Sequence, residues 1–180
     1  MSGTYLALLR GINVGGKNKL LMRDLNQMFS DLGCEDVRTF IQSGNVIFRA
    51  SPTLSVGIPG LIAAQVAKTF GYRTPVVLRT AEELGDVIRS NPFLESGAAE
   101  ETLHLLFLAD LPSPDLVGKL DPHRSTPDAF IVRGREVYLH LPNGVARSKL
   151  TNDYFDSKLA TTSTARNWRT LTKLFELMKS

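Results

Sequence analysis

The amino-acid sequence predicts an α+β protein made of two ferredoxin-like halves. Short apolar runs with the length of β-strands alternate with segments whose apolar residues recur every three or four positions, as in amphipathic helices. In chain order these segments read β-α-β-β-α-β in the first half, and β-α-β-β-α recurs in the second. We expect one half at residues 1–80 and the other, which begins with a linker helix, at residues 81–180.

In the first half, the apolar run Tyr5–Leu9 is typical of a strand inside a sheet. A glycine-rich loop follows, and apolar residues at helical spacing then predict a helix over 21–32, which Gly33 ends. Gln42–Asn45 predicts the tight turn of a β-hairpin. The remaining elements of this half are expected to be strands at 37–41, 46–48 and 76–78 and a helix at 61–70.

In the second half, Thr80 and Glu83 have the spacing of a capping box, which predicts the start of the linker helix. Asn91-Pro92 ends that helix, because proline disfavours helical backbone in the residue before it. The last helix is expected to begin at Thr164 as its N-cap, so that this half lacks its last strand and ends in a helix. The other expected elements are a strand at 103–108, a short helix capped by Ser113, a hairpin of strands at 130–132 and 137–141, and a helix at 149–159.

The composition is that of a globular protein, and we expect it to be cytoplasmic. The single cysteine, Cys34, cannot form an internal disulfide, which fits a reducing compartment. The longest apolar runs are far shorter than the ~20 residues that span a bilayer, so no membrane association is expected. Residues 1–81 carry nine basic against four acidic side chains, and residues 137–180 carry seven against three. This distribution allows basic patches, although ordinary solvated faces explain it equally well.

The loop Gly11–Asn18 nearly matches the phosphate-binding loop, with Gly, four residues and then Gly-Lys between a strand and a helix. Glycines allow successive backbone N–H groups to point at one anion, and a helix N-terminus and a lysine add positive charge. That pattern also requires Ser or Thr after the lysine as a Mg²⁺ ligand, and Asn18 stands there instead. We therefore do not expect a nucleotide triphosphatase, while anion binding by the loop stays open.

The expected topology brings a second loop to the same place. In a ferredoxin-like sheet the first and third strands are antiparallel neighbours, so Arg10 lies beside Asn45, with Arg73 nearby. The competing interpretation is that Gly15 and Gly16 only form a turn and that the asparagines bond loop backbone. The candidate anion-binding residues are Arg10, Gly11, Asn13, Gly15, Gly16, Lys17, Asn18, Gln42, Ser43 and Asn45.

Other chemistry is less well supported. Arg166 and Asn167, at the expected start of the last helix, are additional candidates for the anion site, although a solvated first turn explains them too. The three histidines have no cysteine or carboxylate at ligand spacing, which predicts no metal site. No catalytic residue can be named, because even Ser43 has no evident general base. Whether the protein is an enzyme stays open, and no cofactor is assigned.

Distinctive motifs occur in five places, at Leu9–Asn18, Met22, Thr39–Val46, Asn91–Phe93 and Thr164–Trp168. They resemble the signature segments of a mainly bacterial family, the domain-of-unknown-function 1697 family. The resemblance covers nearly the whole chain and implies an α+β fold of two ferredoxin-like halves, without implying an activity. Ser51–Gly60, which contains two prolines and two glycines, is less typical of the family and is interpreted as a locally altered loop.

Three hypotheses about function follow. The leading one is binding, with or without turnover, of a small anionic and phosphate-bearing metabolite at the glycine-rich loop. The second is a nucleic-acid-binding module that uses the basic terminal thirds, although the central strands lack the aromatic platform of RNA-binding domains. The third is an assembly module in which an open sheet edge pairs with another copy.

Overall fold

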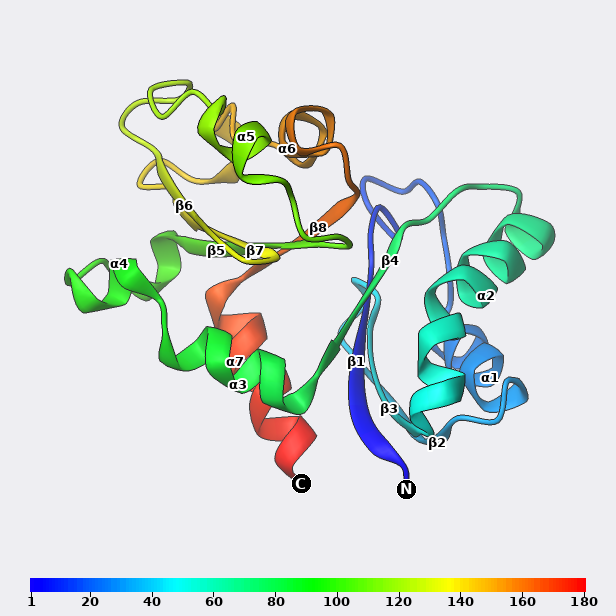
Figure 1. The fold of residues 1–180 in the computed structure, drawn as a ribbon. Helices are drawn as coiled ribbons and strands as arrows, with labels where there is room; N and C mark the ends of the chain where they lie inside the picture. The colour runs from blue at the N-terminus through cyan, green and yellow to red at the C-terminus, as the bar shows by residue number, and fades with distance from the viewer. The chain divides into compact units, whose positions relative to one another are not determined.

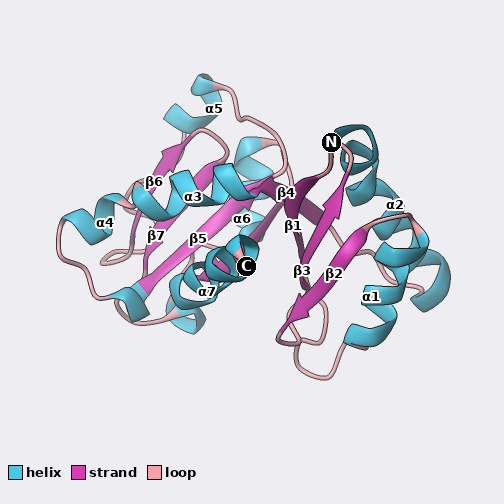
Figure 2. Ribbon diagram, turned by 90° about the horizontal axis from the view of Figure 1, so that it is seen from below, coloured by secondary structure: helices cyan, strands magenta, loops and turns pink.

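The computed structural model describes residues 1–180, which divide into two compact units. Unit 1 comprises Met1–Gly85 and Leu174–Ser180, and unit 2 comprises Asp86–Lys173. Each unit contains one four-stranded antiparallel sheet with helices (Figures 1 and 2). The prediction of an α+β fold with two ferredoxin-like halves is therefore confirmed.

The sheet of unit 1 has the strand order β2-β3-β1-β4, and all of its neighbouring strands are antiparallel. Side chains alternate along β1, so that Tyr5, Ala7 and Leu9 enter the core beneath the two helices. In Figure 1, α1 and α2 lie together on one side of this sheet. The elements are β1 (Gly3–Leu9), α1 (Met22–Asp31), β2 (Glu35–Phe40), β3 (Asn45–Ala50), α2 (Pro52–Phe70) and β4 (Val76–Thr80).

Helix α2 is longer than the sequence pattern indicates. It begins nine residues before the expected start at 61, because Ser51 caps it by accepting a hydrogen bond from the Leu54 amide and Pro52 occupies its first turn. The interpretation of Ser51–Gly60 as an altered loop was wrong. The buried side of α2 consists of Ser55, Ile58, Ile62 and Val66. Their helical spacing is not interrupted by Pro59, Gly57 or Gly60.

The sheet of unit 2 has the order β6-β7-β5-β8, with every neighbouring pair antiparallel. One face packs against the short helices between its strands, through a core that includes Leu106, Leu139 and Phe155. The elements are α4 (Pro92–Glu95), a 3₁₀ turn at Glu100–Thr102, β5 (Leu103–Leu108), α5 (Pro114–Gly118), β6 (Ala129–Arg133), β7 (Glu136–His140), a 3₁₀ turn at Val145–Arg147, α6 (Asn152–Leu159) and β8 (Ser163–Asn167).

The second half therefore has its last strand, and the expectation that a helix replaces it was wrong. Strand β8 pairs with β5 from Ser163↔Leu108 to Asn167↔His104. Thr164 is buried within this strand and is not a helix cap. The side chain of Asn167 takes the capping role, because its Oδ1 accepts a hydrogen bond of 2.8 Å from the Thr170 amide. The final helix, α7, then runs over Trp168–Lys179.

The helix that follows β4 begins as predicted. The Glu83 amide donates to Thr80 Oγ1 and the Thr80 amide donates to a Glu83 carboxylate oxygen, which is the reciprocal capping box. This helix, α3 (Ala81–Arg89), ends just before Asn91, whose Oδ1 caps α4 by accepting from the Phe93 amide. No helix in the chain combines the length and apolar character needed to cross a membrane.

Candidate functional site

Three chain segments meet where β1 ends. The Leu9 amide donates to the Gly44 carbonyl at 2.9 Å, which ties β1 to the turn before β3. The Arg10 amide donates to the Pro75 carbonyl, and the Thr74 hydroxyl donates to the Arg10 carbonyl at 2.8 Å. Residues 10–20, 41–45 and 72–75 thus form one edge of unit 1, called the loop edge below. The expected juxtaposition of the first and third strands is confirmed.

The glycine pair at the tip of the first segment forms a tight turn. The Lys17 amide donates to the Val14 carbonyl at 2.9 Å, and Gly15 and Gly16 have φ values of 56° and 74°. Positive φ at both central residues defines a type I′ turn, which is why glycine is suited to both places. The amides of Gly15 and Gly16 make no hydrogen bond inside the protein, and both residues are exposed. These two N–H groups therefore face solvent.

Asn13 holds this turn in place. Its Nδ2 donates to the carbonyls of Leu20 at 2.9 Å and Gln42 at 2.8 Å, and its Oδ1 accepts from the Leu20 amide at 2.9 Å. The residue has a φ of 53°, in the left-handed region that asparagine tolerates better than most side chains. Asn13 consequently links two loops, and its side-chain amide is already hydrogen-bonded within the protein.

A second, apolar link lies beneath the loop. Ile12 is buried and joins the core of unit 1, although Gly11 is exposed and Asn13 is only partly buried. Gly44 lies against it, since a Cβ added there would stand 2.8 Å from Ile12 Cδ1 and from Leu9 Cβ. Gly44 also has a φ of 82°. Only glycine satisfies both the backbone conformation and this close contact.

The remaining polar candidates divide into internal and exposed groups. Asn18 Nδ2 donates to the Gly11 carbonyl at 2.9 Å. Asn45 is fully buried, and its Nδ2 donates to the Phe40 carbonyl and to Ser43 Oγ. These side chains stabilise the loops, as the competing interpretation expects of asparagines. Gln42 and Lys17, in contrast, have exposed side chains.

The charge of the loop edge is uniformly positive. Its three segments contribute Arg10, Lys17, Lys19 and Arg73, and they contain no aspartate or glutamate. Indeed, residues 37–81 contain no acidic residue at all. Lys17, Lys19 and Arg73 are exposed, and Arg10 is partly so. The three segments of the loop edge therefore carry net positive charge, which favours the approach of anions.

The loop Gly11–Asn18 lacks two structural features of a phosphate-binding loop. Helix α1 begins at Met22, so Asn18–Leu21 separate the glycine turn from the helix and its N-terminus cannot add to the same site. The Lys17 amide is occupied by the Val14 carbonyl and cannot bind a ligand. The loop is a small hairpin instead of a cradle, because the Asn13 amide also bonds the Asn18 carbonyl across its base.

Arg166 and Asn167 belong to β8 of unit 2, whereas the loop edge belongs to unit 1. The Arg166 guanidinium donates to Thr164 Oγ1 and to the Ala165 carbonyl, both at 2.8 Å. Its burial lowers the pKa of Arg166 to about 10, since burial disfavours the charged form. Asn167 caps α7 as described above. Both side chains thus have structural partners within their own unit.

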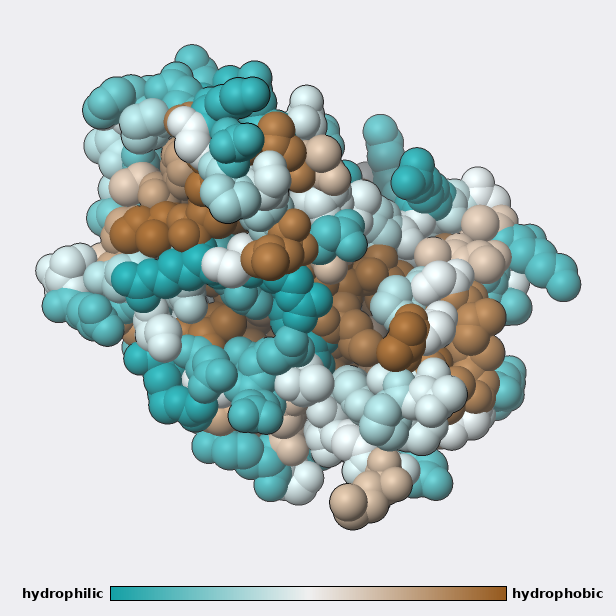
Figure 3. Space-filling view, in the orientation of Figure 1, coloured by the Kyte–Doolittle hydropathy of each residue, from teal (hydrophilic) through white to brown (hydrophobic).

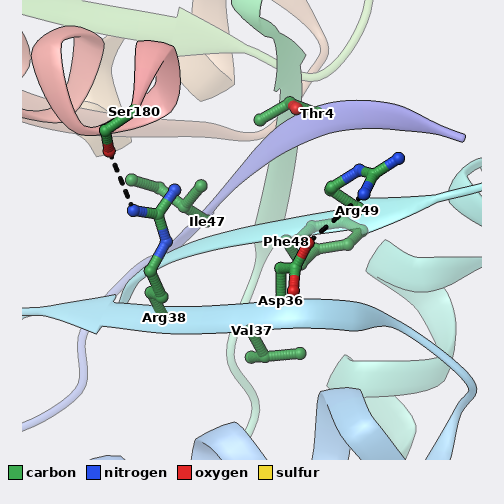
Figure 4. Close-up of a pocket in the computed structure, with 8 residues that line it drawn as sticks. All are labelled: Thr4, Asp36, Val37, Arg38, Ile47, Phe48, Arg49 and Ser180. Carbon is green, nitrogen blue, oxygen red and sulfur yellow. Dashed lines mark hydrogen bonds and ion pairs between the residues drawn. The ribbon is translucent and has the colours of Figure 1, made fainter.

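Unit 1 also has a cavity of about 380 Å³ on the sheet, between β1, β2, β3 and Ser180 (Figure 4). Its two cations are occupied: Arg38 donates to the Leu177 carbonyl and to Ser180 Oγ, and Arg49 pairs with Asp36 at 3.3 Å. The sequence pattern gave no sign of this cavity, because residues from four distant segments line it. A β-bulge between Glu35 and Arg38, which sequence rules do not reveal, shifts the register there.

The fold and the loop edge define a protein of two ferredoxin-like halves with a basic, glycine-containing edge on the first. The chain belongs to the family described as "Protein of unknown function (DUF1697)", whose model matches residues 2–138, so the resemblance seen in the sequence is confirmed. A search among curated proteins finds no match. The conserved bacterial protein SP0830 from Streptococcus pneumoniae has a similar fold, with a TM-score of 0.77 and 21% identity over 100% of both chains.

Proposed function

We propose that the loop edge of unit 1 binds a small anionic, phosphate-bearing metabolite. The supporting observation is the combination of four cations, two solvent-facing glycine amides and no carboxylate on three segments that internal hydrogen bonds hold together. Oxygen atoms of a phosphate group accept hydrogen bonds from backbone amides and from cationic side chains. Lys17, Lys19 and Arg73 are exposed, as are Gly15 and Gly16, so a ligand can approach them from solvent.

The residues take different roles in this proposal. Lys17 and Arg10 supply charge, the amides of Gly15 and Gly16 donate hydrogen bonds, and Gln42 orients the ligand through its exposed amide group. Asn13 keeps the two loops at a fixed separation through its bonds to Leu20 and Gln42, so it contributes through the framework. If turnover occurs, electrostatic stabilisation of a bound anion is the mechanism that this set of groups offers. We place the protein in the cytoplasm, where phosphorylated metabolites are abundant.

A thermal-shift and calorimetry screen with inorganic phosphate, nucleotides and sugar phosphates tests the proposal. A ligand at 100 times its Kd stabilises the folded state by about 2.7 kcal/mol, which gives a clear shift in Tm. We expect Lys17→Ala to weaken binding at least fivefold. The matched control is Lys158→Ala on α6 of unit 2, which removes an exposed lysine elsewhere and should leave binding unchanged. Equal losses in the two variants would refute the assignment to the loop edge.

Salt dependence separates a metabolite from a nucleic acid. Binding of a single phosphate-bearing molecule depends moderately on ionic strength, whereas a nucleic acid that contacts several phosphates loses affinity in proportion to their number. Titration of a short single-stranded oligonucleotide beside the best metabolite, at two salt concentrations, therefore decides the class of ligand. Tighter, steeply salt-dependent binding of the oligonucleotide would favour the nucleic-acid-binding alternative over this proposal.

A further inference from the structure

The outer face of α2 is apolar, although it faces solvent. The helix has a single charged residue, Lys68, among its 19 residues. Val56 is 82% exposed and Leu61 is 46% exposed, and Phe70 is exposed at the end of the helix. Figure 3 shows brown and white atoms over the middle of α2, with few hydrophilic groups. A surface helix normally turns charged residues outward, so this face departs from the usual amphipathic pattern.

The glycines of α2 have no structural task within unit 1. Gly57 and Gly60 lie in ordinary helical backbone, as neither has a positive φ. A Cβ at Gly60 would meet nothing within 4 Å, and one at Gly57 would make only an ordinary contact with Leu61 of the same helix. Glycine inside a helix is unfavourable relative to alanine. These positions are explained if another backbone approaches the helix closely from outside, since small residues allow short distances between helix axes.

A groove next to this face carries one charge of each sign. It has a volume of about 270 Å³ and runs between α1 and α2, where Met28, Leu32 and Leu61 line it together with Asp31 and Lys68. Both charged residues are exposed, and neither forms an ion pair within the protein. Asp31 accepts only a hydrogen bond of 2.7 Å from Gln27. The groove is thus electrically neutral but has two separated, unpaired charges on an apolar floor.

We propose that this α2 face, defined by Val56, Gly60, Leu61, Ala64 and Lys68 with Asp31 at its rim, is a contact surface for a second copy of this chain. In a twofold contact each surface meets its own copy, so Asp31 of one molecule can face Lys68 of the other, twice. A partner whose surface is only acidic or only basic would place a like charge opposite either Asp31 or Lys68. The self-complementary charge pattern therefore selects a second copy over an acidic or a basic partner.

The expected dimer is weak. A pair of helices covers less than the roughly 800 Å² per partner of a standard interface, so association should depend on protein concentration in the micromolar range. Sedimentation velocity on the full chain, from low to high micromolar concentration, measures it directly. Ala64→Glu places a charge in the centre of the contact while it keeps a good helix former, and we expect this variant to stay monomeric. Lys158→Asp on α6 is the matched control and should dimerise like the unmodified chain.

Charge reversal tests the pairing itself. Asp31→Lys and Lys68→Asp each create like-charge contacts, so each variant alone should dimerise at least about tenfold more weakly at low salt. Mixed together, the two variants have opposite charges across the contact and should form a heterodimer, and the double variant should dimerise again. A chain that stays monomeric at every concentration overturns the proposal. A dimer that still forms in the Ala64→Glu variant also overturns it. The same holds if each charge reversal weakens the dimer but the mixture of the two variants does not restore it.

Discussion

The side-chain amide of Asn13 donates to the main-chain carbonyl of Gln42 over 2.8 Å, and this bond joins two loops that lie 29 positions apart in the sequence. The same side chain also binds both the carbonyl and the amide of Leu20. One residue thereby fixes the width of the loop edge on which the proposed anion site depends.

Replacement of Asn13 should disturb both stability and binding. We expect Asn13→Ala to lower the free energy of unfolding by about 2–3 kcal/mol, because three hydrogen bonds are lost and alanine is strained at a φ of 53°. Asn13→Gly removes the same bonds without the backbone strain and should cost about 1 kcal/mol less. Urea denaturation of the three proteins measures both differences. Identical midpoints for the alanine variant and the unmodified chain would contradict the structural role.

Gly44→Ala should be among the most destabilising single substitutions in unit 1. The added methyl group would lie 2.8 Å from Ile12 and Leu9 on a backbone with a φ of 82°, so we expect a loss of about 3 kcal/mol or more. Gly71→Ala is the matched control, because Gly71 has a φ of 76° but open space around it, and should cost about 1 kcal/mol. If both variants lose the same free energy of unfolding, the close contact of Gly44 with Ile12 does not contribute to stability.

Gly60→Ala should raise stability while it weakens self-association. At low concentration, where the chain is monomeric, alanine should add about 0.5–1 kcal/mol to the free energy of unfolding, since no neighbour opposes its methyl group. At high concentration the same methyl group would hold a second α2 helix farther away. Urea denaturation at two protein concentrations separates the effects. If the variant is more stable but its dimerisation constant is unchanged, Gly60 does not serve to let a second α2 helix approach closely.

Cys34 should make the protein sensitive to alkaline pH. Burial raises the pKa of the Cys34 thiol from 9.0 to about 11, so the folded protein keeps a proton that the unfolded chain releases between these values. This contribution to stability is therefore present below pH 9 and lost as pH rises through 11. Cys34→Val should flatten that part of the pH profile of unfolding. In the folded chain at pH 8, the buried Cys34 thiol should react slowly with Ellman's reagent. Unfolding in urea exposes the thiol and should make the reaction fast.

Strands β1, β3 and β4 of unit 1 could be predicted from the sequence because their side chains are apolar on at least one face. β8 could not: Ser163–Asn167 contains no large apolar residue, and its strand conformation comes from pairing with β5 along its whole length. Tertiary pairing overrides local preference in such a segment. The N-terminal part of α2 was missed for a related reason, as Pro59 and the glycines conceal the apolar spacing that Ile58 begins.

The candidate site was predictable in its location but not in its hydrogen bonding. The order of the strands brings the end of β1 next to the start of β3, as the sequence predicts, although the register pairs Asn45 with Leu8 and not with Arg10. Which polar side chains face outward depends on the turn that each loop adopts, and the sequence does not show that the Asn13 and Asn45 amides bond main-chain carbonyls. Whether Lys17 and Gly15 bind an anion stays a prediction.

The division of the chain into two units falls inside secondary structure. The first crossing, between Gly85 and Asp86, lies within α3, and the second, between Lys173 and Leu174, lies within α7. A protease or an engineered cut at either point would leave main-chain groups in mid-helix without partners. We therefore expect residues 86–173 expressed alone, with α3 and α7 both cut in mid-helix, to be less stable than the same residues in the full chain.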